Sequence, residues 1–388
     1  MSAADPDRLG LYIHWPYCVR ICPYCDFNVY KAANPDGEAL FEAMLADLER
    51  WRDLAGPRPL ASVHFGGGTP SLMRPAQVAA LLEAAGRLFG FAPDAEIGLE
   101  ANPKEAAAFA GLAAAGVERL SLGVQAFNDA DLRRLGRDHG ADEARRAIGA
   151  AQAAFARVSI DMIYAREGQS LEAWRSELEE AFALGLDHLS LYQLTIEPGT
   201  AFERQARRGA LRPPGEDQAA DLFDLTQDMT EAAGLPAYEI SNHARSRAAQ
   251  SAHNRLYWEG ADWIGIGPGA HSRLGRADQG GRTGYTAALK PADYIKGAAS
   301  GSTHAAEPLS AREEAVERIL MGIRLLDDGL DGARVERITG HSPDAEARDR
   351  LARQGLVSIE HDRIRLTRAG RIYGDAIAEA LVPAGQEG

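Results

Sequence analysis

Between Leu9 and about Thr195, two kinds of segment follow one another along the chain. Short runs that are apolar, or in which apolar and polar residues alternate, are separated by alanine-rich amphipathic stretches. Runs rich in β-branched residues predict strands, whereas apolar residues repeated at helical spacing predict helices. Their regular exchange is typical of βαβ units, whose strands pair in parallel. Six strands are predicted, over residues 11–14, 62–65, 96–100, 119–124, 157–163 and 188–194.

Helices are predicted between these strands and after the last of them. Pro75 falls near one predicted start, where a helix tolerates a residue without a backbone N–H. Six strand and helix units predict an α/β fold, a partial six-stranded (β/α)6 barrel of the TIM type. The predicted helices cover residues 37–54, 75–88, 104–115, 142–155, 171–184 and 215–233.

The pattern changes beyond the sixth unit. Two further strand-like runs occupy residues 237–240 and 263–266, and residues 273–302 are rich in Gly, Ala, Thr and Ser with little periodicity. Such a stretch predicts a linker. The predicted division is a barrel with its extension over 1–272, a linker over 273–304 and a C-terminal domain over 305–388.

The C-terminal region predicts a small helical domain with a winged-helix arrangement. Helical patterns cover residues 311–326, 345–354 and 369–381, and a strand pair over 357–366 turns at His361-Asp362. Residues 305–388 hold 16 acidic residues against 12 arginines and no lysine, which disfavours a DNA-binding role. A docking or lid role is expected instead.

Composition narrows the class of protein. The 388 residues are 45% hydrophobic and carry a formal net charge of −14, so the chain can fill a core but lacks the basic surface that nucleic acid selects. The sequence shows neither a targeting signal at its start nor an apolar run long enough to cross a membrane. A soluble cytoplasmic protein without a nucleic-acid partner is expected.

The three cysteines of the chain lie together directly after the first predicted strand. Cys18, Cys22 and Cys25 form a C-x3-C-x2-C motif, and an odd number of close thiols is a poor disulfide framework. Three thiolates can hold three irons of a 4Fe–4S cubane, which leaves the fourth iron open for the amino and carboxylate groups of S-adenosylmethionine (SAM). Two alternatives stay open, a structural zinc site completed by His14 or another residue, and three inert buried thiols.

Polar residues also recur where the other strands end, which is where parallel barrels carry their chemistry. Gly66-Gly67-Gly68-Thr69-Pro70 follows the second strand, and its bare backbone would admit a ligand, although an ordinary turn has the same composition. Glu100 and Gln125 end the next two strands, and Asp161 lies within the fifth, where solvated surface is a poor explanation for an acid. Glu100 also fits a helix-capping acid, and Arg137 a surface base.

Several motifs of this chain occur together in one family. They are YIHWP at 12–16, GGGTP at 66–70, E-x-N-P at 100–103, SLGVQAF at 121–127 and ISN at 240–242. In this combination the chain resembles the radical SAM superfamily that contains oxygen-independent coproporphyrinogen III oxidase (HemN) and the heme chaperone HemW. The resemblance covers nearly the whole chain and implies a 4Fe–4S cluster on Cys18, Cys22 and Cys25. It also implies a SAM pocket lined by Tyr12, Tyr24, Gly67, Gly68, Thr69, Glu100, Gln125, Arg137 and Asp161.

Three features of the sequence favour the HemW branch of this superfamily. The oxidases carry a further cysteine where this chain has Phe27, and they have an N-terminal extension, whereas few residues precede the first predicted strand here. His253-Asn254-Arg255-Leu256-Tyr257-Trp258 resembles the HNxxYW motif that is associated with heme in HemW-like proteins. His253 and His271 are therefore candidate heme ligands, although a hydrogen-bonded structural histidine is an alternative for both.

The resemblance implies a heme chaperone that binds heme, a 4Fe–4S cluster and SAM. Apo-hemoproteins such as respiratory enzymes would receive the heme, and a reductant protein is a further candidate partner. The alternatives are an oxygen-independent oxidase that decarboxylates coproporphyrinogen III and another radical enzyme acting on a tetrapyrrole. Residues 165–170 read AREGQS where the family usually has a GLPGQT run, so the loop after the fifth strand is expected to differ locally.

Overall fold

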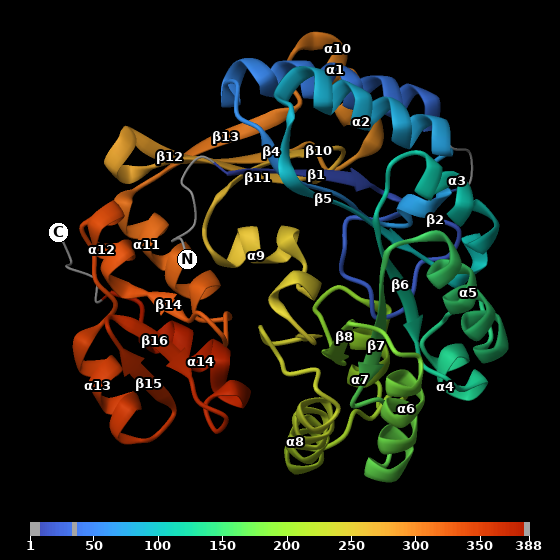
Figure 1. Ribbon diagram of the computed structural model, residues 1–388, viewed down its shortest axis with the longest axis vertical. Coiled ribbons are helices and arrows are strands. Elements are labelled where there is room, and N and C mark those ends of the chain that lie inside the picture. The colour runs from blue at the N-terminus through green and yellow to red at the C-terminus, as the bar shows by residue number, and fades with distance from the viewer. Residues whose placement is uncertain (1–7, 33–36, 384–388) are drawn as a thin grey trace.

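Parallel strands form the centre of an 11-stranded sheet in the computed structural model, which describes residues 8–32 and 37–383 (Figure 1). The strand order is β13-β12-β11-β10-β1-β4-β5-β6-β7-β8-β9, and the neighbours from β10 to β8 run parallel. All six strands predicted for the barrel, and the run at 263–266, are confirmed. The parallel strands are β1 Leu9–Trp15, β4 Leu60–Gly67, β5 Phe91–Ala101, β6 Arg119–Gln125, β7 Arg157–Tyr164, β8 His188–Gln193 and β10 Asp262–Ile266.

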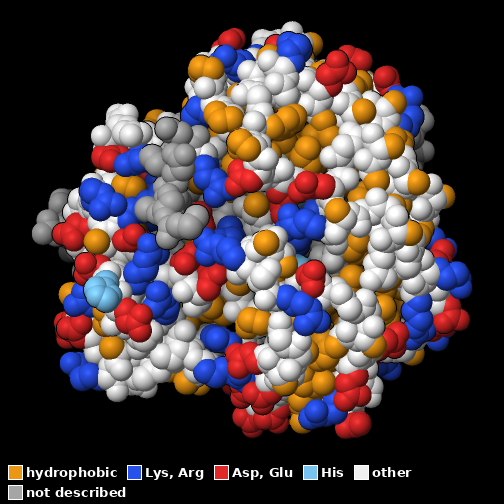
Figure 2. All heavy atoms as spheres, in the orientation of Figure 1, with side chains coloured by type: hydrophobic (Ala, Val, Ile, Leu, Met, Phe, Trp, Pro, Cys, Tyr) orange, Lys and Arg blue, Asp and Glu red, His pale blue; other side chains and the backbone are white. Residues whose placement is uncertain are grey.

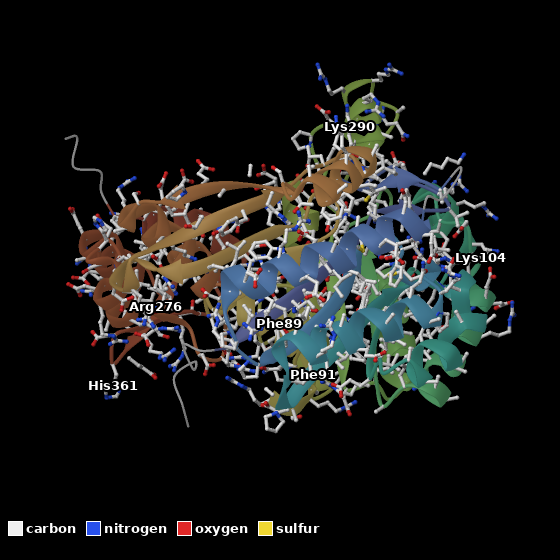
Figure 3. The ribbon with its side chains drawn as sticks, turned by 90° about the horizontal axis from the view of Figure 1, so that it is seen from above. Phe89, Phe91, Lys104, Arg276, Lys290 and His361 are labelled. Atoms are coloured by element: carbon white, nitrogen blue, oxygen red, sulfur yellow. The ribbon has the colours of Figure 1, made fainter. Side chains whose placement is uncertain are left out.

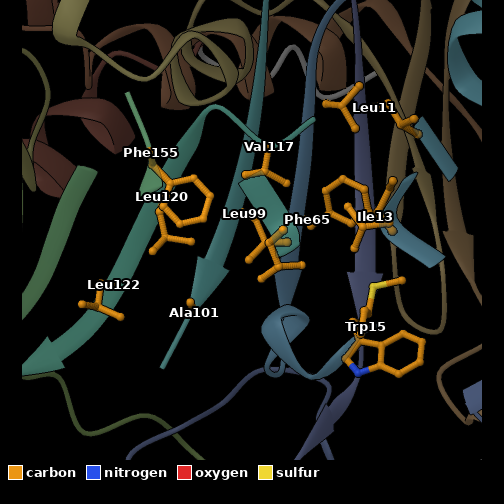
Figure 4. Close-up of a cluster of buried hydrophobic side chains, with 14 of the residues drawn as sticks. Leu11, Ile13, Trp15, Phe65, Leu99, Ala101, Val117, Leu120, Leu122 and Phe155 are labelled. Carbon is orange, nitrogen blue, oxygen red and sulfur yellow. The ribbon is translucent and has the colours of Figure 1, made fainter. Parts of the chain in front are cut away.

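The two faces of these strands differ in chemistry. Leu11 and Ile13 of β1 and Phe65 of β4 are fully buried in the hydrophobic core between the sheet and its helices (Figure 4). Side chains alternate along a strand, so Tyr12 and His64 point to the opposite, concave face, where their rings stack 6.4 Å apart. The lumen of this partial barrel is therefore lined by polar groups.

Helices cover the outer face of the sheet, as the amphipathic stretches predict. Seen from above, α1 and α2 lie over the sheet (Figure 3). The segment predicted as one helix over 104–115 is a 3-10 turn, Pro103–Ala108, followed by the short helix α3 Phe109–Ala114. The other predicted helices are confirmed as α1 Gly37–Ala55, α2 Pro75–Phe89, α5 Ala141–Ala154, α6 Leu171–Ala183 and α8 Glu216–Ala232. Among the described residues before 273, three short helices were not predicted, α4 Asp129–Arg134, α7 Ala201–Arg207 and α9 Ala252–Trp258.

The prediction of a strand at residues 237–240 is wrong. Ala237 makes only an isolated bridge with His243, and the strand lies further on, as β9 Asn242–Ala244 antiparallel to β8. The Glu239 carboxylate accepts hydrogen bonds from the backbone N–H of Ser241 at 3.0 Å and from the side chain of Asn242. These bonds turn the chain back on itself before it can extend.

Residues 273–304, predicted as a linker, instead extend the sheet. They include most of β11 His271–Arg276, all of β12 Gly281–Ala287 and α10 Pro291–Ser300, and they lead into β13 His304–Leu309. These strands approach one another so closely that a Cβ atom on Gly275 would lie 2.4 Å from the carbonyl oxygen of Gly281. Glycines required by this packing erase the alternation that identifies a strand, which is why the composition resembled a linker.

The C-terminal region has its own hydrophobic core, which includes Ile319, Val335 and Ile364. The predicted hairpin is confirmed, and both of its turn residues have positive φ, 47° at His361 and 65° at Asp362. Charged side chains of both signs are spread over the visible face of this unit (Figure 2). Its elements are α11 Ala311–Gly322, β14 Leu330–Asp331, α12 Gly332–Thr339, α13 Ala345–Arg353, β15 Val357–Glu360, β16 Arg363–Leu366, a 3-10 turn Arg371–Tyr373 and α14 Gly374–Ala380.

Within the described residues, every helix is too short or too polar to cross a bilayer. Residues 1–7, in which no targeting signal was expected, lie outside the described part of the chain.

Candidate functional site

The cysteine loop is tied at both of its ends. The short strand β2 Tyr17–Cys18 pairs with β3 Tyr30–Lys31, and the N–H of Ala32 donates to the carbonyl of Cys18 at 2.9 Å. Between them the loop turns at Cys22, whose carbonyl accepts the N–H of Cys25 at 3.2 Å. All three thiols therefore lie within one closed loop at the carboxyl end of β1.

Neighbouring loops hold the middle of the cysteine loop in place. Pro23 packs so tightly on Gly136 that a Cβ atom there would lie 2.4 Å from the proline ring, and its carbonyl accepts the N–H of Phe202 at 2.8 Å. The ring of Tyr24 lies 6.2 Å from that of Phe202. The loop position thus depends on α7 and on the turn after α4.

A cavity of about 320 Å³ lies beneath this loop at the carboxyl ends of the parallel strands. It brings together the three cysteines and all of the predicted pocket residues except Tyr12, which lies deeper in the lumen. The predicted residues that line it are Cys18, Cys22, Cys25, Tyr24, Gly67, Gly68, Thr69, Glu100, Gln125, Arg137 and Asp161. Sequence reasoning missed Asn102, Gly123, Ile163 and the segment 192–197 after β8.

The three glycines at the carboxyl end of β4, Gly66 to Gly68, allow close packing of the protein on itself. A Cβ atom on Gly67 would lie 2.6 Å from the ring of His14, and one on Gly68 would lie 2.8 Å from the backbone of Pro16 and Tyr17. The missing side chains therefore face β1, whereas ligand access was the predicted reason for them. The backbones of Gly67 and Gly68 still line the cavity.

Arg137 anchors one wall of the cavity and is not a surface base. Its guanidinium donates to the carbonyl of Gly123 at 3.0 Å, to the side-chain oxygen of Asn102 and to the sulfur of Cys22 at 3.4 Å. Asn102 in turn donates to the hydroxyl of Thr69 at 3.2 Å, which donates to the sulfur of Cys18 at 3.5 Å. Two cysteine sulfurs thus accept hydrogen bonds from a polar network, as sulfurs bound to an iron–sulfur cluster do.

Two carboxylates face the cysteine loop across the cavity. Glu100 accepts a hydrogen bond from the N–H of Gly67 at 3.3 Å and lies 3.2 Å from Nε2 of His64. Asp161 accepts a hydrogen bond from the hydroxyl of Ser121 at 2.8 Å. Burial raises the pKa of Asp161 to about 6, and Glu100 adds to this shift. Both side chains are placed to meet a ligand that carries positive charge.

The thiols of Cys18 and Cys25 favour their protonated forms. Burial raises the pKa of Cys18, and it raises the pKa of Cys25 to about 11. A metal must therefore displace the protons when it binds. His14 is not available as a fourth ligand for zinc, because its ring nitrogens bond the hydroxyl of Tyr12 at 3.1 Å and the carbonyl of Asn28 at 2.9 Å.

The ends of β6 and β7 are fixed by a buried arginine from the loop that departs from the family pattern. Arg166 donates to the carbonyls of Gln125 at 3.3 Å and Ile163 at 2.9 Å, and it pairs with Glu177. Gln125 has a positive φ of 69°, which is strained for a residue with a side chain. Arg166 therefore supports the strand ends that present Gln125 and Asp161.

Comparisons with known proteins agree with this geometry. The model of the radical SAM superfamily matches residues 12–181, and that of the HemN C-terminal domain matches residues 309–373. The heme chaperone HemW of Escherichia coli is 36% identical over 96% of this chain and 98% of its own length, and that of Mycobacterium tuberculosis is 35% identical over 96% and 94%. The chain belongs to the HemW group of the radical SAM superfamily.

Further relatives of this HemW-group protein extend the comparison. The mitochondrial radical S-adenosyl methionine domain-containing protein 1 of Bos taurus is 35% identical over 99% of this chain and 90% of its own length. The solved structure of E. coli coproporphyrinogen III oxidase (HemN) superposes with a TM-score of 0.81 at 24% identity, covering 98% of this chain and 91% of the oxidase. That likeness concerns the fold.

Membership of the radical SAM superfamily implies a 4Fe–4S cluster and SAM, and the cavity fits both. The cavity is lined by the free thiols of Cys18, Cys22 and Cys25 and by two carboxylates. A cubane takes one thiolate on each of three irons, so its ligands stand apart. Among the described residues, no three His, Cys, Asp or Glu side chains are grouped as ligands of a single metal ion.

His253 of the HNRLYW segment does not lie at the cavity of this HemW-group protein. Its side chain is buried near the opposite end of the lumen, with 1% of the residue exposed. One ring nitrogen bonds the hydroxyl of Ser62 at 2.8 Å and the other bonds the hydroxyl of Tyr257 at 2.8 Å. Because hydroxyls occupy both nitrogens, this geometry favours the structural alternative for His253 over heme ligation.

His271 keeps a nitrogen for a ligand. It begins β11 as an exposed residue, and its Nδ1 lies 3.2 Å from the hydroxyl of Thr286. Partial burial of the ring, together with the nearby Arg273, lowers the pKa of His271, which favours the neutral imidazole that binds iron. Of the two candidate heme histidines, His271 is the one that keeps a ring nitrogen without a hydrogen-bond partner among the described residues.

Proposed function

We propose that this HemW-group protein is a heme chaperone that binds a 4Fe–4S cluster, SAM and heme and delivers heme to apo-hemoproteins. The observation that carries the proposal is the cavity, which joins three cysteines to the strand-end residues while Phe27 stands where the oxidases have a further cysteine. Phe27 is 63% exposed at the mouth of this cavity. The HemW relatives, which match nearly the whole chain, support the same assignment.

The cluster would be held by Cys18, Cys22 and Cys25. A bound cluster supplies one-electron reduction. The donors that reach the cysteine sulfurs, the hydroxyl of Thr69 and the guanidinium of Arg137, would offset the negative charge of thiolate ligands in a partly buried site.

SAM would occupy the remainder of the cavity. Its amino and sulfonium groups are cationic, and the carboxylates of Glu100 and Asp161 face that space. Gln125 offers a side-chain amide, and the exposed backbone of Gly67 and Gly68 offers further hydrogen-bonding groups. A ligand amine between two carboxylates would gain charge-assisted hydrogen bonds that neutral side chains do not provide.

Heme would bind outside the cluster site, with His271 as the candidate axial ligand. The exposed phenyl ring of Phe27, together with Val19 and Ile21, forms an apolar rim on the cysteine loop. A porphyrin offers a flat apolar face and an iron, which would suit an exposed apolar rim and a histidine with a free nitrogen.

The proposal is tested by giving one anaerobically reconstituted preparation two substrates in parallel. In one sample, coproporphyrinogen III, SAM and a reductant are incubated and decarboxylated product is measured. In the other, heme is titrated and the Soret band is followed, with His271→Ala beside His361→Ala, an exposed histidine on the distant hairpin. We expect heme binding that depends on His271 and no decarboxylated product. Product formation would support the oxidase, and absence of heme binding would overturn the chaperone.

A further inference from the structure

The HNRLYW segment lies under a column of aromatic rings that leads to the cavity. The ring of His253 stacks on that of His64 with centroids 4.9 Å apart and an interplanar angle of 18°. Tyr12 covers both, at 6.4 Å from His64 and 6.2 Å from His253. The column begins on α9 at the far end of the lumen and reaches the wall of the cavity at Glu100.

The hydrogen bond that the His64 side chain makes among the described residues goes to the carboxylate of Glu100. A carboxylate oxygen only accepts, so Nε2 of His64 donates to Oε1 of Glu100 across 3.2 Å. The other ring nitrogen is buried and has no hydrogen-bond partner among the described residues. A buried polar atom left without a partner calls for an explanation, and here the ring is turned so that its bonded side faces Glu100.

The surrounding residues make room for this orientation. A Cβ atom on Gly98 would lie 2.8 Å from Nδ1 of His64, so any larger residue at that position would push the ring away. On the other side of the carboxylate, the N–H of Gly67 donates to Oε2 of Glu100 at 3.3 Å. Both oxygens of Glu100 are thus fixed by donors from β4, one of which rests on the ring column.

We propose that His64 is a positioning residue of the cofactor cavity, which orients Glu100 toward its ligand, and that His253 holds the His64 ring in place. This inference rests on the proposed function, because it takes Glu100 as a contact of SAM. It also gives the histidine of the HNRLYW segment a purpose other than heme ligation. The segment would then support SAM binding from the opposite end of the barrel.

The test compares SAM affinities of reconstituted full-length variants by equilibrium dialysis. His64→Phe keeps a ring for stacking but loses the donor, and we expect its Kd for SAM to rise roughly tenfold, the scale of one hydrogen bond to a charged group. His64→Gln keeps an N–H donor and should recover part of the loss. Iron content should stay unchanged in both variants, since no cysteine is touched.

A double-mutant cycle with Glu100→Gln separates positioning from a general loss of structure. If His64 acts through Glu100, adding His64→Phe to Glu100→Gln should change the Kd by less than about twofold. His188→Phe is the matched control, because this buried histidine bonds Ser159 at 2.7 Å and Tyr238 at 3.0 Å and does not line the cavity. It should lower the melting temperature without changing the Kd for SAM.

The outcomes separate the positioning role of His64 from the proposed SAM site. Full additivity in the cycle, or an unchanged Kd in folded His64→Phe, overturns the positioning role while leaving the SAM site standing. An unchanged Kd in Glu100→Gln removes Glu100 from the SAM contacts and overturns the positioning role, whereas absence of SAM binding to the wild-type protein overturns the proposed function. Should His64→Phe fail to fold, His253→Gln removes the stacked ring instead, and a rise in Kd that disappears in the Glu100→Gln background carries the same conclusion.

Discussion

Asp161 makes SAM binding depend on pH in a defined direction. Burial raises the pKa of this carboxyl to about 6 from an ordinary value near 3.8. If only the ionised form binds the cationic groups of SAM, the apparent Kd rises by a factor of 1 plus ten to the power of the pKa minus the pH. Affinity should therefore be constant above pH 7, about twofold weaker at pH 6 and roughly tenfold weaker at pH 5.

The same shift has a consequence for stability whose sign is opposite to that of a salt-bridged aspartate. Because the folded pKa of Asp161 is raised, the folded state holds its proton more tightly than the unfolded chain does. Below its ordinary pKa, Asp161 therefore costs no folding stability. Above about pH 6 it destabilises the folded state by the full amount that the raised pKa implies. Asp161→Asn should thus raise the melting temperature of the cluster-free protein at pH 7 and leave it nearly unchanged at pH 4.

Isothermal titration of SAM into the reconstituted protein between pH 5 and pH 8 measures the first effect, with Asp161→Asn as the variant that cannot titrate. Ser121→Ala is a second variant, because the hydroxyl of Ser121 donates to Asp161 and holds its pKa down. Its loss should move the midpoint to higher pH. A wild-type profile as flat as that of Asp161→Asn would refute the reasoning.

Three further outcomes are expected. His253→Ala should cost about 3 to 5 kcal/mol of folding stability in chemical unfolding, because it empties a buried site and strands two hydroxyls, yet the Soret band of bound heme should not shift. His271→Ala should weaken heme binding and shift that band, without changing iron–sulfur absorption. Arg137→Met leaves the carbonyl of Gly123 and the amide of Asn102 without their donor; it should bind less iron after reconstitution, whereas Arg207→Met on the exposed face of α7 should not.

The barrel and most of the cavity were predictable because both follow from periodicity and from one topological rule. Parallel strands place their carboxyl ends at one edge, so Glu100, Gln125 and Asp161 had to converge once the strands were recognised. Their convergence with the cysteine loop is confirmed as geometry, whereas their contacts with SAM stay a prediction. Asn102 was missed although it stands two residues beyond Glu100, because its importance comes from a bond to Arg137, which the chain order does not show.

Two further differences between the sequence predictions and the structure have physical causes that a single sequence hides. The linker at 273–304 was predicted from glycines that in fact permit close strand packing. A flexible linker and a tightly packed strand pair can both be rich in glycine, so composition does not separate them. His253 was associated with heme through a motif, but a motif does not state which way a helix turns its residues. On α9 the imidazole points into the lumen, where two hydroxyls occupy it.

The bonds that close the cysteine loop have a consequence for repair. Pairing of β2 with β3, and the contacts of Pro23 with neighbouring loops, involve no metal, so the entropy of ordering this loop is spent when the chain folds. A cluster destroyed by oxygen would leave behind a socket that keeps its shape. Iron and sulfide would then rebuild the cluster in the folded protein. Oxidative loss of the cluster would require neither degradation nor resynthesis of the chain.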